Sequence, residues 1–81
     1  MWVIHLYNGD ATPWSTTWVT GFMRNGHEAS GSLMVVEPGN GEGSNDVYLF
    51  GSNPNDPNDQ ITRLEVEART SQGDQVAEFR M

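Results

Sequence analysis

The chain has 81 residues, a formal net charge of −7, and neither cysteine nor lysine. A chain of this length buries only about 60 to 65% of its unfolded surface, so residues 1–81 are expected to form one small domain. The absence of cysteine excludes disulfides and most structural zinc sites, and the absence of lysine excludes Schiff-base and P-loop chemistry. No segment resembles a membrane span or a signal peptide. We expect a soluble protein, cytoplasmic or virion-associated, and the Met directly before Trp2 favours a complete gene product.

Apolar segments recur at short intervals along the chain and are separated by turn-forming residues, which is typical of β structure. The turns leave no uninterrupted helical pattern, so no long helix is expected. Six strands are predicted, in chain order: Trp2 to Tyr7, Trp14 to Met23, Ala29 to Val36, Asp46 to Phe50, Gln60 to Thr70 and Gln75 to Met81. The predicted fold class is all-β, a small antiparallel barrel or two-sheet sandwich of five to seven short strands with a C-terminal hairpin.

The first predicted strand is apolar on both faces. Trp2 and Ile4 fall on one face, and Val3 and Tyr7 fall on the other. A strand with two apolar faces is expected at the centre of a sheet or under a loop.

The second predicted strand carries an aromatic stripe. Regular alternation places Trp14, Trp18 and Phe22 on one face. Filling of the core is the simpler interpretation, because aromatic side chains supply a large part of a small core. The intervening Thr16 and Thr20 leave open the alternative, an exposed platform that stacks on carbohydrate or contacts another protein.

Negative charge concentrates between the third and fifth predicted strands, where no basic residue occurs. The acidic residues of this region are Glu37, Glu42, Asp46, Asp56 and Asp59. Their negative field disfavours direct binding to nucleic acid or to an anionic membrane and favours a partner protein with a basic surface. The loop of residues 51–59 lacks the EF-hand pattern, so turn formation is its expected role, with an irregular calcium site as the alternative.

No cofactor, metal or catalytic site is predicted. His5 and His27 have no recognisable third ligand, so we expect a partly buried His5 and a loop His27 instead of a zinc site. Glu65 and Glu67 would lie about 7 Å apart on one strand face, a spacing that glycosidases also use, but alternation on any exposed strand produces it. No Ser occupies the sharp turn typical of nucleophilic hydrolases.

The fifth predicted strand has the clearest alternation. One face carries Thr62, Leu64, Val66 and Ala68, and the opposite face carries Arg63, Glu65, Glu67 and Arg69. A type II′ turn centred on Gly73 and Asp74 would place Glu67 opposite Arg80 in the hairpin. A two-residue slip would place Glu67 opposite Glu78, and we reject it because facing like charges are unfavourable.

These features predict a non-catalytic, acidic protein-binding module that docks on a larger protein assembly, for example as an accessory or decoration subunit of a virion. The second hypothesis is a small phage-type inhibitor, such as an anti-CRISPR protein, that blocks a basic nucleic-acid-binding surface. The third is carbohydrate binding through Trp14 and Trp18. Homo-oligomers through free β edges are a further alternative. The candidate contact residues are Trp14, Trp18, Phe22, Glu37, Glu42, Asp46, Asp56 and Asp59.

Overall fold

The computed structural model describes all of residues 1–81 and contains six strands and no helix. The strands are β1 (Trp2–His5), β2 (Trp14–Met23), β3 (Glu28–Val36), β4 (Asp46–Leu49), β5 (Ile61–Thr70) and β6 (Gly73–Arg80). The predicted all-β class is confirmed, and each predicted strand matches an observed one to within two residues at either end. No helix of the chain has the length and apolar character needed to cross a membrane.

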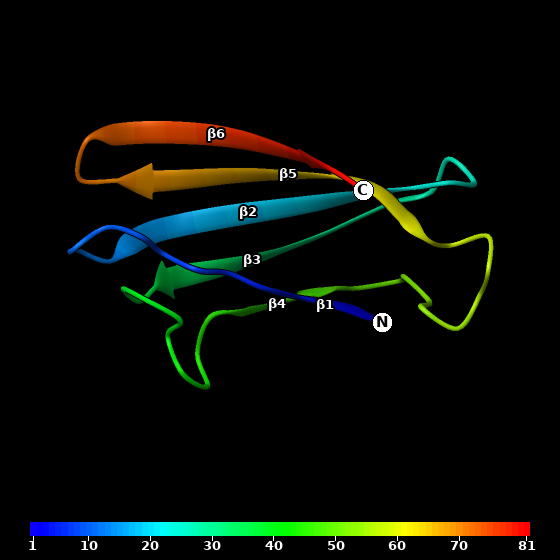
Figure 1. Cartoon of the computed structure of the whole chain (residues 1–81), viewed down its shortest axis with the longest axis horizontal. Coiled ribbons are helices and arrows are strands. Elements are labelled where there is room, and N and C mark those ends of the chain that lie inside the picture. The colour runs from blue at the N-terminus through cyan, green and yellow to red at the C-terminus, as the bar shows by residue number, and fades with distance from the viewer.

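The strands form two antiparallel sheets. The larger sheet has the order β3-β2-β5-β6, and the smaller sheet pairs β1 with β4. In Figure 1, β1 and β4 lie on the β3 side of the large sheet, and β6 forms its opposite margin. β1 is thus an edge strand, and the predicted central position is wrong. Its inner residue Ile4 packs against the core, while Val3 on its outer face stays exposed.

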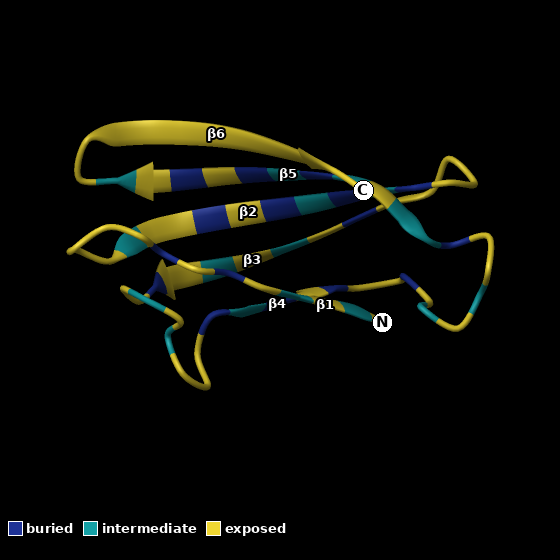
Figure 2. Ribbon diagram, in the orientation of Figure 1, coloured by how far each residue is buried: buried dark blue, intermediate teal, exposed yellow.

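The core lies between the two sheets. The largest completely buried apolar side chains are Val19 of β2, Val36 of β3, and Val47 and Leu49 of β4. Figure 2 shows that burial is concentrated in β2, β4 and β5, whereas every residue of β6 is exposed. The small sheet therefore covers only part of the inner face of the large one.

The two sheets approach most closely where β4 passes β3. A Cβ atom placed on Gly31 of β3 would collide with the carbonyl oxygen of Tyr48 and with the side chain of Val47. Only glycine allows the two backbones to come this close. Gly31 therefore determines the spacing between the sheets.

β2 changes the face that it presents to the core near its first residues. The register between β2 and β5 shifts between Ser15 and Thr17. Beyond this β-bulge Thr17 and Val19 are buried and Trp18 points outward, whereas before it Trp14 packs against the core. Because a bulge reverses the alternation, Trp14 and Trp18 lie on opposite faces. The predicted common stripe is therefore wrong.

The turn between β5 and β6 has Ser71 and Gln72 at its centre, since Thr70 pairs with Gly73. Only glycines have positive φ in this chain, and Gly73 has φ of 103°. Negative φ at Ser71 and Gln72 excludes the type I′ and II′ turns, and the glycine that follows is typical of a turn closed by a bulge. The predicted turn centred on Gly73 and Asp74 is wrong.

The hairpin register differs accordingly from the prediction. Glu67 lies opposite Val76 and not opposite Arg80. The predicted inner face is retained, because Leu64 lies opposite Phe79 and the observed slip is an even number of residues. Turn geometry therefore determines this register, and the cross-strand charge pairs do not.

Candidate functional site

An apolar groove separates the β1 side of the protein from the β5–β6 hairpin, with a volume of about 620 Å³. Its base is formed by Leu64 and Val66 of β5, which are almost fully buried. Its walls include Ile4, Tyr7, Trp14, Ala77, Phe79 and Met81. We refer to these eight residues as the groove.

The groove is open because the small sheet does not reach β6. β6 pairs only with β5, and its inner face has no covering layer. Phe79 is consequently 52% exposed and Met81 72% exposed, although both point toward the interior side of the sheet. Contiguous exposed apolar surface of this kind marks interaction sites in soluble proteins.

Trp14 is held in the groove by a hydrogen bond. Its indole Nε1 donates to Asp10 Oδ2 at 2.8 Å, and this bond satisfies the one polar atom of the ring. The remaining ring surface is available for apolar contact.

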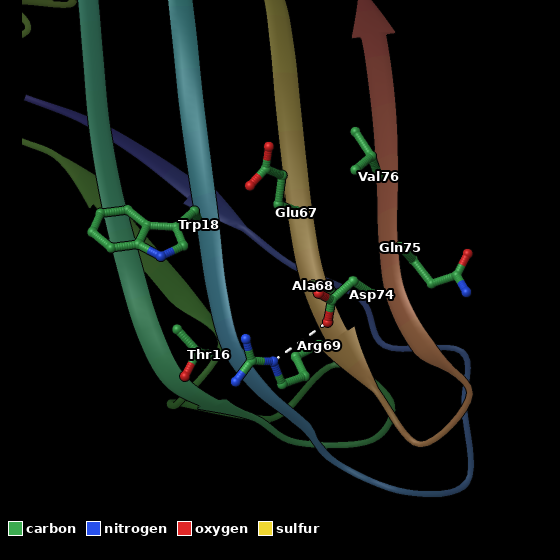
Figure 3. Close-up of a pocket in the computed structure, with 8 residues that line it drawn as sticks. All are labelled: Thr16, Trp18, Glu67, Ala68, Arg69, Asp74, Gln75 and Val76. Carbon is green, nitrogen blue, oxygen red and sulfur yellow. Dashed lines mark hydrogen bonds and ion pairs between the residues drawn. The ribbon is translucent and has the colours of Figure 1, made fainter.

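A second, shallower pocket of about 350 Å³ lies on the outer face of the large sheet (Figure 3). Trp18, which is 50% exposed, and Glu67 project side by side from neighbouring strands. Next to them Arg69 Nε lies 3.3 Å from Asp74 Oδ1. Trp18 is the only aromatic residue in this pocket.

Phe22 also lies on the outer face but does not extend the Trp18 surface. The guanidinium of Arg63 lies over its ring, 3.8 Å from the ring centre. Trp14 lies on the opposite face of the sheet, in the groove. No aromatic platform of Trp14, Trp18 and Phe22 exists, and the predicted core position holds only for Trp14.

The candidate acidic residues are divided between two ends of the molecule. Glu37 and Glu42 lie in the connection between β3 and β4, while Asp56 and Asp59 lie in the connection between β4 and β5 at the opposite end (Figure 1). Asp46, at the start of β4, has its Oδ1 2.7 Å from His5 Nδ1. The five carboxylates therefore do not form one continuous surface.

The histidine environments differ from each other. The His5 side chain is 49% exposed, in keeping with the predicted partial burial, and its Nδ1 contacts Asp46. His27 lies in the turn between β2 and β3, as expected, with its Nδ1 2.9 Å from Asp59 Oδ1.

Asp59 is buried, and its carboxylate connects the β4–β5 loop with the turn between β2 and β3. The backbone N–H of Asn53 donates to Asp59 Oδ2 at 2.7 Å, and the side chains of His27 and Asn25 contact Oδ1. The Asn53 hydrogen bond, followed by the contact with His27, lowers the pKa of the Asp59 carboxyl below its usual value. This arrangement assigns Asp59 a structural role.

The other polar groups of this loop are used in local turns. Asn53 Oδ1 accepts a hydrogen bond from the Asn55 N–H, and Asp56 Oδ1 accepts one from the Asn58 N–H. No group of three or more His, Cys, Asp or Glu side chains is close enough to hold a metal ion. The geometry corresponds to Asx turns.

The residues that form most of the groove were not among the sequence candidates. Alternation identifies the inward face of β6, but it does not reveal whether another layer covers that face. The available signal was the second apolar face of the first predicted strand, which carries Val3 and Tyr7, because it indicates more apolar surface than the small core can absorb; both residues are exposed, and Tyr7 lines the groove.

Comparisons of the chain with known protein families, with curated proteins and with solved structures find no match.

Proposed function

We propose that this chain is a non-catalytic protein-binding module, an accessory or decoration-type subunit that docks on a larger protein assembly such as a virion, and that the groove is its contact site. The observation that supports this is the uncovered inner face of β6, where Phe79, and Met81 directly after the strand, are exposed to solvent. A preformed groove binds a partner at a small conformational cost.

The groove specifies the chemistry of its partner. Its lining is predominantly apolar, so the partner segment inserts large apolar side chains between Trp14 and Phe79. The net charge of −7 favours basic residues around that segment, because complementary charge accelerates association and suppresses binding to acidic proteins.

The other two hypotheses have less support. An inhibitor of a basic surface needs its carboxylates on one face, whereas here they lie at two ends, and Asp46 and Asp59 already contact histidines. A carbohydrate platform through Trp14 and Trp18 needs both rings on one face, whereas the bulge in β2 separates them.

The test compares a groove variant with a matched surface variant in the protein's native host. The groove variant combines Phe79→Ser with Met81→Ser, and the control combines Met34→Ser with Phe50→Ser, which change the same residue types at exposed positions outside the groove. We expect the wild type and the control to retain a partner protein from the host that the groove variant does not retain. With the purified partner, the groove variant should bind at least about tenfold more weakly. Equal binding by all three proteins would refute the groove as the contact site.

A further inference from the structure

The free edge of β6 fits a second copy of this chain. We infer that two copies pair antiparallel through β6, about a two-fold axis at Ala77, so that their large sheets join into one continuous sheet. This inference goes beyond the proposed function, because it uses the edge of β6 and leaves its inner face, which lines the groove, open.

β6 presents unpaired backbone groups along one side. It is the last strand of the large sheet and extends from Gly73 to Arg80. The N–H of Met81 donates to the carbonyl of Thr62 at 3.0 Å, so odd-numbered residues direct their backbone groups toward β5. The N–H and C=O groups of the even-numbered residues therefore point to the free edge.

This edge has only part of the usual protection against strand addition. Natural edge strands are shortened, bulged, interrupted by proline or charged, and of these devices β6 has only charged side chains. β6 instead keeps a regular register with β5 over its whole length and contains no proline. The edge is therefore competent to pair with another strand.

The charge pattern of β6 is complementary to itself about Ala77. In this register Asp74 lies opposite Arg80 of the second copy, and Val76 lies opposite Glu78 of the second copy. All four are even-numbered residues whose backbone groups point outward, so each pair can exchange two hydrogen bonds. Both charged pairs across the axis join opposite charges.

Other registers are less favourable. A two-residue slip places either Asp74 opposite Glu78 or Glu78 opposite its own copy, and both arrangements bring like charges together. A slip that centres the axis on Phe79 leaves Asp74 and Val76 unpaired. Within one chain the turn between β5 and β6 fixes their register. No such connection joins two separate chains, so the charged pairs can determine the register between the two copies of β6.

The side chains at the interface can adopt this arrangement. Ala77 at the axis is small, and directly opposed residues in a pair without mutual hydrogen bonds have Cα atoms about 4.5 Å apart. The side chains of Arg80 and Asp74 are 79% and 74% exposed, and their contacts within the chain, with Glu78 and Arg69 respectively, are weak surface ion pairs that can exchange for contacts across the edge.

A cysteine scan tests the position of the axis directly, because the native chain has no cysteine. Ala77→Cys places two thiols opposite each other within disulfide distance. Gln75→Cys and Phe79→Cys are the controls, since in this register each is about 13 Å or more from its own copy. Mild oxidation should yield a covalent dimer for Ala77→Cys well ahead of both controls on a non-reducing denaturing gel. Cross-linking of the three variants at equal rates, or fastest at Phe79, would refute the register.

A charge swap tests the dimer without a covalent bond. Sedimentation equilibrium should show that the wild type dimerises, with Asp74→Arg and Arg80→Asp each weakening the dimer by about tenfold or more. The double variant Asp74→Arg with Arg80→Asp restores the facing pairs and should recover most of the affinity. A monomeric wild type at every concentration examined would overturn the inference, as would a dimer that is insensitive to both single substitutions.

Discussion

Glu65 of β5 and Glu78 of β6 lie directly opposite each other in the hairpin. Arg63 stabilises this pair of like charges, because its Nη1 lies 2.7 Å from Glu65 Oε1 and 3.7 Å from Glu78 Oε2. Arg80 adds a second contact, 2.9 Å from Glu78 Oε1. The same Arg63 guanidinium stacks on Phe22 of β2. One cation thus connects three strands on the outer face of the large sheet.

Removing this cation should destabilise the fold more than removing its neighbour. Arg63→Gln leaves two facing carboxylates and removes the contact with Phe22, so we expect a loss of about 1 to 2 kcal/mol. Arg80→Gln, which within one chain affects only the exposed contact with Glu78, should cost the monomer about 0.5 kcal/mol or less. Urea denaturation measures both. In a Glu65→Gln background the cost of Arg63→Gln should shrink, and an unchanged cost there would contradict the proposed charge compensation.

The stability of the fold should depend on the ionisation of Asp59. Its pKa is lowered in the folded state by the Asn53 N–H and by His27, so the stabilising contribution is complete above the ordinary pKa and is lost as the pH falls through the lowered value. Asp59→Asn should therefore reduce stability at neutral pH. It should also make the melting temperature depend less on pH in the acid range. Asp56→Asn is the control, because it removes a carboxylate from the same loop while the amide oxygen can still accept the hydrogen bond from the Asn58 N–H. If the melting temperature of Asp59→Asn falls with acid pH as steeply as that of the wild type, this role is contradicted.

The spacing between the two sheets should not tolerate a methyl group at Gly31. Gly31→Ala forces the added carbon against the backbone of Tyr48, which cannot rotate away, so we expect a loss of about 2 to 3 kcal/mol. Gly9→Ala serves as the control, since a Cβ there meets only Tyr7 Cε1 at an ordinary 3.7 Å. It should change stability by no more than about 0.5 kcal/mol in thermal or urea unfolding. Equal stability of the two variants would mean that the sheets can separate without cost.

The two tryptophans of β2 should differ sharply in their contribution to stability. Trp14→Ala removes a ring packed against the core and should cost about 3 kcal/mol, whereas Trp18→Ala removes a half-exposed ring and should cost about 1 kcal/mol or less. Acrylamide should quench the fluorescence of Trp18 more efficiently than that of Trp14, measured in variants that carry Trp2→Phe and retain one of the two rings. The reverse order of stabilities would place the β-bulge elsewhere.

Strand positions could be predicted from the sequence because they depend on local chemistry. Turn residues such as Asn25-Gly26 and Pro38-Gly39 separate apolar runs, and the observed strands lie between these turns. The alternation of β5 likewise predicted Leu64 and Val66 as inward, and both are buried. These features do not depend on which strands later become neighbours.

Register and aromatic placement could not be predicted, because both depend on neighbours. A shift of the β5–β6 register by any even number of residues keeps Phe79 inward, so alternation cannot decide between these registers. Exposed charge pairs are too weak to determine the register against the preference of the turn. The bulge that separates Trp14 from Trp18 arises only when β2 pairs with β5. The groove was missed for the same reason: exposure of Met81 depends on where the small sheet ends.

The remote pairing of β1 has a consequence for the order in which the chain folds. His5 pairs with Asp46, and the indole N–H of Trp2 donates to the carbonyl of Asp59 at 3.0 Å, so nothing nearby in sequence holds this strand. The hairpins β2–β3 and β5–β6 close short loops and can form early, whereas β1 must bring together distant segments at a larger entropic cost. The first strand in chain order is thus expected to find its place last, and the groove gains its second wall only when β1 has docked.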